Sequence, residues 1–296
     1  MTTTVETTLA REEWLAATRA HEARVERYTG AHLERRAHGE RHPIEDFLFE
    51  YYPHRPSHLR RWHPGPGVVL ADAADTYAGR SGYVVDEDGN ARVDVDSLLE
   101  RRGRTVAFVH GLLSATLSRP GTHDCFGLHE WAMVYRLEPG EQRHEQLPLR
   151  LTQEATDAVV EGHRVRCSHF DAYRFFTPDA VERNTLRPTR ETQVRYEQPG
   201  CLHAGMDVYK WCFKLSPLVS SDLTIAAFEL AREIRELDMA ASPYDVSEFG
   251  LAAVAIETPA GKAEYVERQR AFSVRSNDLR RQLLAVLDTL PPFATP

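Results

Sequence analysis

Residues 221–240 read SDLTIAAFELAREIRELDMA, and this stretch decides the fold class that the sequence predicts. Leu223, Leu230, Ile234 and Leu237 recur at helical spacing, with charged residues interspersed between them. This pattern is typical of an α-helix that buries one face and exposes the other to solvent. The stretch therefore predicts a strongly amphipathic helix that packs against a core.

Helical patterns extend through most of the rest of the chain. Residues 9–37 carry a few apolar residues among many charges, which predicts an N-terminal, largely exposed amphipathic helix. The pair Pro199-Gly200 precedes a helix predicted at 201–215, and helices at 221–240 and about 258–290 make up the C-terminal part, 221–290. Shorter helices are predicted at 43–62, 95–102, 104–118, 125–137 and 152–162.

One segment carries a clear β signal. Short β-prone arms flank the turn Asp88-Gly89 within residues 83–94, which predicts a β-hairpin. We therefore expect a mainly α fold, a single helical domain over 1–296 with one small β-hairpin.

Composition and charge narrow the functional classes. The chain has 296 residues and a formal net charge of −8, whereas proteins that coat DNA or RNA are normally basic. No stretch approaches the roughly 20 apolar residues of a membrane span, and the Thr-rich N-terminus lacks the layout of a signal peptide. We therefore expect a cytoplasmic protein without a membrane partner, whose four cysteines are reduced thiols.

Side chains suited to catalysis gather in three segments, 125–131, 163–171 and 201–207. Each segment holds a cysteine, at least one histidine and a carboxylate. Burying such groups costs several kcal/mol unless each has a partner, so a core does not need them. We therefore expect a candidate active-site core at 123–215, and the protein is more readily interpreted as an enzyme than as a scaffold.

Two His–Asp pairs are the candidate catalytic groups. His203 and Asp207 are four residues apart, so they share one face of the helix predicted at 201–215. His169 and Asp171 point the same way if their segment is an extended strand or loop. Either pair suits proton transfer or metal binding. The alternatives are ordinary hydrogen bonds and a polar loop.

A metal site is a further hypothesis. His129, His169 and His203 are its candidate ligands, with Asp171, and they would hold a divalent metal only if three distant segments converge. Glu130 follows His129 on a helix and points about 100° away from it, so the two do not share a ligand. His129 is alternatively a core histidine, and we expect the cysteines to be small buried hydrophobes.

Three strings resemble a known family. They are HPIEDFLFEYY at 42–52, which runs on to LRRWHPG at 59–65, LHEWAMVY at 128–135 and RCSHFDAYRFF at 166–176. Together they resemble an actinobacterial family labelled 3-methyladenine DNA glycosylase, and the resemblance extends over most of the chain. It implies a hydrolase that cleaves the N-glycosidic bond of a modified or alkylated purine, in DNA repair or nucleoside salvage.

That reaction assigns roles to residues of this chain. Asp171 or Asp207 would activate water or stabilise the sugar cation, and an aromatic slot would hold the base. A basic strip at 54–63 would contact a phosphate or a nucleic-acid backbone, or is simply solvated. The substrate-binding candidates are Trp131, Tyr173, Phe175, Trp211, Arg61 and Trp62.

Three functions therefore stay open. The first is the N-glycosidase, with a modified nucleobase, a nucleoside or damaged DNA as its partner. The second is a metal-dependent enzyme acting on a small-molecule metabolite through a His/Asp site. The third is a non-catalytic protein that binds nucleic acid or another ligand. The sequence lacks the Walker A, GxGxxG and GxSxG motifs, which disfavours nucleotide-driven and α/β-hydrolase chemistry.

Overall fold

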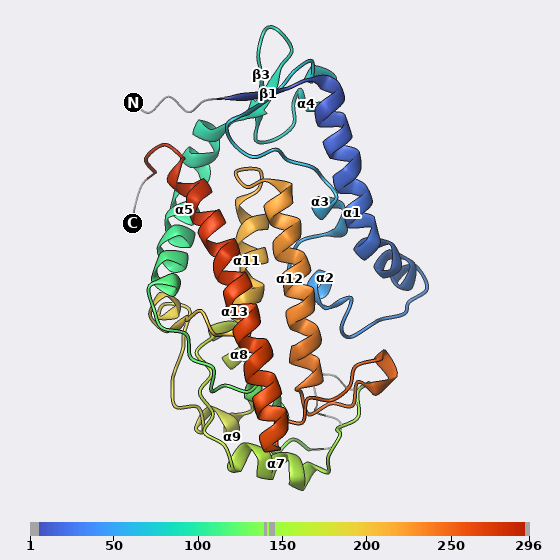
Figure 1. Ribbon diagram of the computed structural model, residues 1–296, viewed down its shortest axis with the longest axis vertical. Coiled ribbons are helices and arrows are strands. Elements are labelled where there is room, and N and C mark those ends of the chain that lie inside the picture. Colours follow the sequence, from blue (N-terminus) through green and yellow to red (C-terminus); the bar gives the residue numbers. More distant parts are fainter. Residues whose placement is uncertain (1–5, 139–140, 142–145, 294–296) are drawn as a thin grey trace. The chain divides into compact units, whose positions relative to one another are not determined.

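A computed structural model describes residues 6–138, 141 and 146–293 (Figure 1). Over these residues the chain forms thirteen α-helices, one short 3-10 helix and a single small sheet. The fold is therefore mainly α, as the sequence predicted. Among the described residues, none of the helices combines the length and the apolar character needed to cross a bilayer.

Five long helices dominate the chain. They are α1 (Arg11–Ala37), α5 (Val95–Leu117), α11 (Leu202–Leu215), α12 (Ser221–Ala240) and α13 (Pro259–Asp288). The sequence placed the last three within a few residues of these bounds. The helix predicted at 9–37 begins at Arg11, because residues 7–9 form a strand, and it buries one face through Trp14, Val25 and three polar residues.

The shorter elements connect these helices. They are α2 (Phe47–Tyr51), α3 (Pro56–Leu59), α4 (Ala74–Tyr77), α6 (Leu128–Ala132), α7 (Gln153–Glu161), α8 (Phe170–Tyr173), α9 (Pro178–Val181), α10 (Gln193–Tyr196) and the 3-10 helix η1 (Ser247–Phe249).

Two predicted helix boundaries are wrong. The helices expected at 95–102 and 104–118 are one helix, α5, which continues through Gly103; a glycine inside a helix weakens it by only about 1 kcal/mol. Of the segment expected to be helical at 125–137, only α6 (Leu128–Ala132) is an α-helix. Phe126 (φ +49°) and Gly127 (φ +71°) adopt left-handed conformations before it, and Arg136 (φ +52°) adopts one after it.

The predicted hairpin is half of a four-stranded sheet. The strands β3 (Tyr83–Val85) and β4 (Ala91–Val93) pair in antiparallel fashion around the Asp-Gly turn. The strand β2 (Val68–Leu70) joins β4, and β1 (Thr7–Leu9) lies parallel to β2, giving the order β1-β2-β4-β3. The single hairpin was an incomplete prediction, because a three-residue strand carries too little periodicity to be recognised.

The chain forms two compact units built from interleaved segments. The first takes in the chain up to Gly111, Val208–Glu229 and the chain from Leu279 onward. The second takes in Leu112–Asp207 and Leu230–Asp278. The expectation of a single domain stays a prediction.

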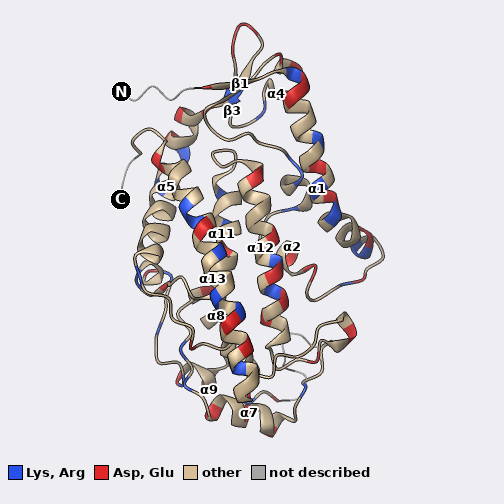
Figure 2. Ribbon diagram, in the orientation of Figure 1, with Lys and Arg blue, Asp and Glu red and all other residues tan. Residues whose placement is uncertain are grey.

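The first unit contains the sheet and α1. Trp14, Trp62, Leu70 and Tyr77 belong to its buried hydrophobic cluster, and the Trp14 Nε1–H donates to the Ala71 carbonyl oxygen at 3.0 Å. The sheet lies beside the N-terminal end of α1 (Figure 1). Acidic and basic residues are interspersed along α1 and α13 (Figure 2), so neither helix presents a surface of one charge sign.

Candidate functional site

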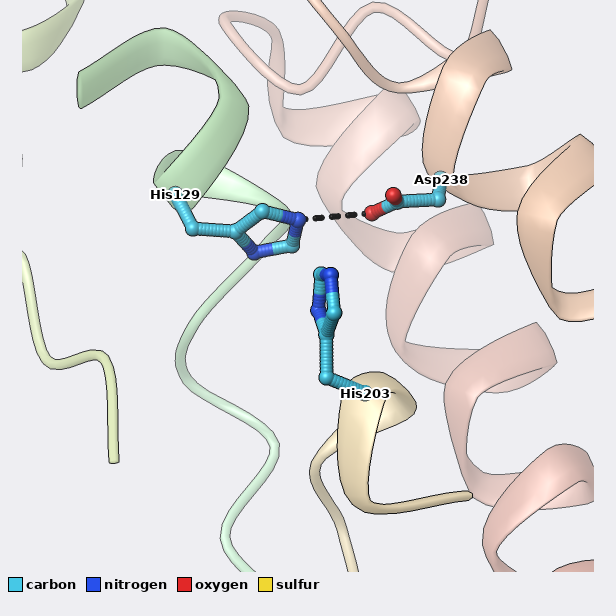
Figure 3. Close-up of side chains that lie close together, drawn as sticks. All are labelled: His129, His203 and Asp238. Atoms are coloured by element: carbon cyan, nitrogen blue, oxygen red, sulfur yellow. Dashed lines mark hydrogen bonds and ion pairs between the residues drawn. The ribbon is translucent and has the colours of Figure 1, made fainter. Parts of the chain in front are cut away.

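The structure brings three buried polar side chains together inside the second compact unit. His129 comes from α6, His203 from the first turn of α11 and Asp238 from the last turn of α12 (Figure 3). Their exposed fractions are 3%, 6% and 0%. Donor atoms from the three side chains all lie within 4.8 Å of one another. This group is called the HHD set below.

The local backbone explains why His129 faces inward. The two left-handed residues before α6 turn the chain sharply, and the short helix that follows is buried along its whole length. His129 Nε2 donates to Asp238 Oδ1 at 2.8 Å. The His203 ring rises from α11 toward this pair (Figure 3), and its centroid lies 4.4 Å from that of His129 with the ring planes at 85°.

A buried arginine holds the carboxylate in place. Arg235 Nη1 donates to Asp238 Oδ2 at 3.0 Å and to Glu130 Oε1 at 2.9 Å. Arg235 and Asp238 are one helical turn apart on α12, and Glu130 is the neighbour of His129 on α6. As the helix spacing predicted, Glu130 points away from His129; it contacts Arg235 instead.

Burial and pairing set the charges of the HHD set. Burial disfavours a charged His129, but the Asp238 carboxylate and its hydrogen bond outweigh burial and raise the pKa of His129 well above 6.5. Burial also opposes ionisation of Asp238, yet the His129 charge holds the pKa of Asp238 far below its usual value. Burial, followed by the nearby His129 charge, lowers the pKa of His203 well below 6.5.

A second buried group lies next to the first. His169 precedes α8, Glu197 follows α10 and Asp207 lies in α11, and their donor atoms also lie within 4.8 Å of one another. His169 Nε2 donates to Asp207 Oδ2 at 3.2 Å, and the Gln193 side-chain amide donates to Glu197 at 2.9 Å. This group is called the HED set.

His203 lies between the two sets. Its ring centroid is 5.3 Å from that of His169, with the ring planes at 29°. His203 and Asp207 share a face of α11, as their spacing predicted, but each joins a different set. The three candidate metal ligands His129, His169 and His203 therefore do converge from three segments.

Asp171 has a different position from the one expected. Residues 170–173 form α8 rather than an extended segment, so the argument that His169 and Asp171 point the same way does not apply. Asp171 instead pairs with Arg174, one turn later, at 3.3 Å. The carboxylate beside His169 comes from Asp207.

A small cavity adjoins the HHD set. It has a volume of about 10 Å³, the space of about one water molecule. His129 and His203 line it together with Cys125, Cys167 and Cys201. The three catalytically suited segments of the sequence thus meet here, and one cysteine of each lines the cavity.

The thiols around the cavity differ in their contacts. Cys125 lies near the His129 ring and contributes to the raised pKa of His129. Burial raises the pKa of Cys201 to about 12 and raises the pKa of Cys167 well above 9. Cys167 and Cys201 are therefore neutral thiols at pH 7, which makes them poor nucleophiles.

A larger pocket of about 270 Å³ shares a wall with the small cavity. Arg166, Ser168 and Gln198 line both. Arg119, Arg195 and Tyr196 line the larger pocket alone, and the Arg195 guanidinium lies 5.6 Å from the Tyr196 ring centroid. A pocket with three arginines suits a small molecule that carries a phosphate or carboxylate.

The predicted aromatic residues of the second unit occupy packing positions. Trp131 is fully buried, and its Nε1–H donates to the Ala241 carbonyl oxygen at 2.9 Å. Tyr173 packs against Phe176, with ring centroids 5.2 Å apart. The Arg174 guanidinium lies 4.0 Å from the Phe175 ring centroid.

The other three predicted substrate-binding residues belong to the first unit. Trp62 is buried in the hydrophobic cluster beneath the sheet, and Arg61 is exposed. Trp211 is buried and meets Phe108 edge-on, with ring centroids 5.9 Å apart.

Sequence reasoning missed Asp238, Arg235 and Glu197. Asp238 lies outside the candidate core at 123–215, but a signal for it exists: Arg235 and Asp238 interrupt the apolar face of residues 221–240 one turn apart. Charged residues are almost never fully buried unless they are paired, so two of them on the apolar face of a helix indicate a buried ion pair. Glu197 follows a four-residue helix, and no periodicity identifies it.

No protein-family model, curated protein or solved structure matches this chain. The resemblance to the glycosylase-labelled family therefore stays a prediction.

Replacing Arg235 tests whether the buried network stabilises the fold. Arg235→Met removes the partner of two buried carboxylates, which should cost about 3–5 kcal/mol of unfolding free energy. Arg275→Met is the matched control, because Arg275 pairs with Glu233 at the surface, where both side chains are about half exposed; we expect a loss below about 1 kcal/mol. Urea denaturation measures both, and equal losses contradict the assignment.

The pKa of His129 predicts a pH-dependent stability. Because folded His129 has a pKa well above 6.5, the folded protein keeps a proton that the unfolded chain releases above that value. The stabilisation is complete below about pH 6.5 and falls as the pH rises through the raised pKa. Urea denaturation in EDTA between about pH 6 and pH 9 should show this fall in the wild type. The His129→Gln protein should lack it, and an unchanged slope would refute the ion pair.

Proposed function

We propose that the protein is a metal-dependent enzyme acting on a small anionic molecule, with a divalent cation held by the HHD set. The observation that carries the proposal is the meeting of two buried imidazoles and a buried carboxylate within 4.8 Å. Zinc and non-haem iron enzymes use this donor set. Three protein ligands leave coordination positions for water or substrate.

The groups around the HHD set favour a ligand role. Arg235 fixes the orientation of the Asp238 carboxylate, as outer hydrogen bonds do in metal sites. The small cavity beside His129 and His203 accommodates about one water, which is the group that a catalytic cation activates. When bound, the cation would supply that activation or polarise a substrate oxygen.

The donor atoms of the HHD set indicate the class of cation. Its ligands are two imidazole nitrogens and a carboxylate oxygen. This favours Zn²⁺, Fe²⁺ or Mn²⁺ over a soft ion such as Cu⁺.

The arginine-lined pocket supports the substrate class. Among the described residues Arg195 has no carboxylate partner, and Arg166 pairs only loosely with Asp124, at 3.6 Å. Arg119 donates through Nη1 to the Glu197 carbonyl oxygen at 2.9 Å. The remaining N–H groups of these arginines can bind an anionic group. Because Arg166, Ser168 and Gln198 line both spaces, a ligand in this pocket would lie next to the cavity that His129 and His203 line.

Cleavage of an N-glycosidic bond is the second candidate function. Tyr196 offers an aromatic face beside Arg195, so the pocket suits a base and a phosphate together. Its volume of about 270 Å³ is close to the lower limit for small-molecule sites. The test is to incubate a methylated purine nucleotide with the protein. Release of the free base supports this candidate if the nucleotide alone in buffer releases none.

Metal analysis tests the main proposal. Protein reconstituted with Zn²⁺ or Mn²⁺ should retain at least one ion per chain by mass spectrometry, and Asp238→Asn should lose it because a carboxylate ligand is gone. Asp288→Asn is the matched control, since Asp288 accepts a hydrogen bond from His110 at 2.8 Å at the surface. A metal-free wild type, or an Asp238→Asn protein with unchanged metal content, contradicts the proposal.

The affinity of the pocket for anions should depend on Arg195. Arg195→Ala should weaken binding of inorganic phosphate about tenfold, the equivalent of losing about 1.4 kcal/mol of a charge-assisted hydrogen bond. Arg104→Ala, an exposed arginine elsewhere, should leave binding unchanged. Isothermal titration calorimetry measures both, and equal affinities for the two variants would exclude this pocket as the anion site.

A further inference from the structure

We propose that the HED set of His169, Glu197 and Asp207 holds a second divalent cation, so that the metal centre is dinuclear. This inference rests on the proposed function, because it adds an ion beside the one at the HHD set. One imidazole and two carboxylates suit a borderline or hard cation such as Zn²⁺ or Mn²⁺.

The first observation is the convergence of three buried donors from separate segments. The exposed fraction is 1% for each of His169, Glu197 and Asp207, and their donor atoms lie within 4.8 Å of one another. A divalent cation bound there would coordinate both carboxylates and supply a positive charge beside them.

The second observation concerns the ring of His169. Its Nε2–H donates to Asp207, while Nδ1 is buried and makes no hydrogen bond with any described residue. Leaving a buried polar atom without a partner costs about 1–3 kcal/mol. An imidazole nitrogen without a hydrogen-bond partner is an atom that a metal ion can bind.

The third observation is the adjacency of the two sets. Helix α11 supplies His203 to one set and Asp207 to the other, one turn apart. The His203 ring lies 4.4 Å from the His129 ring and 5.3 Å from the His169 ring, measured between centroids. Two-metal enzymes place their ions about 3.5–4 Å apart to clamp an anionic group, so neighbouring donor sets of this kind suit that arrangement.

Metal stoichiometry with separate variants tests the inference. Mass spectrometry of Mn²⁺-reconstituted wild type should give two ions per chain. Glu197→Gln and His169→Gln should each give one, and Asp238→Asn should give one from the other site. Glu264→Gln is the matched control, since Glu264 forms only an exposed pair with Arg268, and it should keep two. Far-UV circular dichroism and the melting temperature identify any variant that fails to fold.

Electron paramagnetic resonance supplies an independent readout. Two neighbouring Mn²⁺ ions should give an exchange-coupled spectrum in the wild type, and Glu197→Gln should give the six-line spectrum of an isolated ion. One ion per chain that is lost in Asp238→Asn but kept in Glu197→Gln overturns the second site and leaves the proposed function standing. No bound ion in the wild type removes both, and two ions that persist in Glu197→Gln and His169→Gln overturn the assignment to these residues.

Discussion

One fully buried carboxylate, Asp238, constrains the second compact unit more than any other group. A buried negative charge is costly unless it is paired on every side. His129 pairs with one of its oxygens and Arg235 with the other, while Arg235 also binds Glu130. The network therefore fixes α6 against the last turns of α12. It also holds His129 in the orientation that makes it a potential ligand.

The remaining parts of the site follow from that constraint. With α6 held in place, His129 faces His203, and His203 in turn lies beside His169. The cysteines of the three segments surround the small cavity on which His129 and His203 open. Six imidazole and carboxylate side chains thus occupy adjacent positions behind an arginine-lined pocket, which is an arrangement suited to metal-assisted chemistry on an anionic molecule.

The long helices could be predicted because each repeats its pattern over several turns. Residues 201–215, 221–240 and 258–290 carry that pattern, and the structure ends each within a few residues of the expected position. Short elements were not predictable in the same way. The strands of three residues and the helices of four residues depend on their neighbours, and α6 depends on left-handed residues whose conformation no periodicity reveals.

The sequence by itself determined the helical class, the hairpin and the three segments rich in cysteine, histidine and carboxylate. It also paired His203 with Asp207 on one face of a helix, since that relation depends only on local geometry. Tertiary structure alone decided that Asp238 joins His129, that Asp207 rather than Asp171 meets His169, and that Trp131 packs in the core. These contacts join residues 38 to 110 positions apart, so packing between elements sets them and no local pattern encodes them.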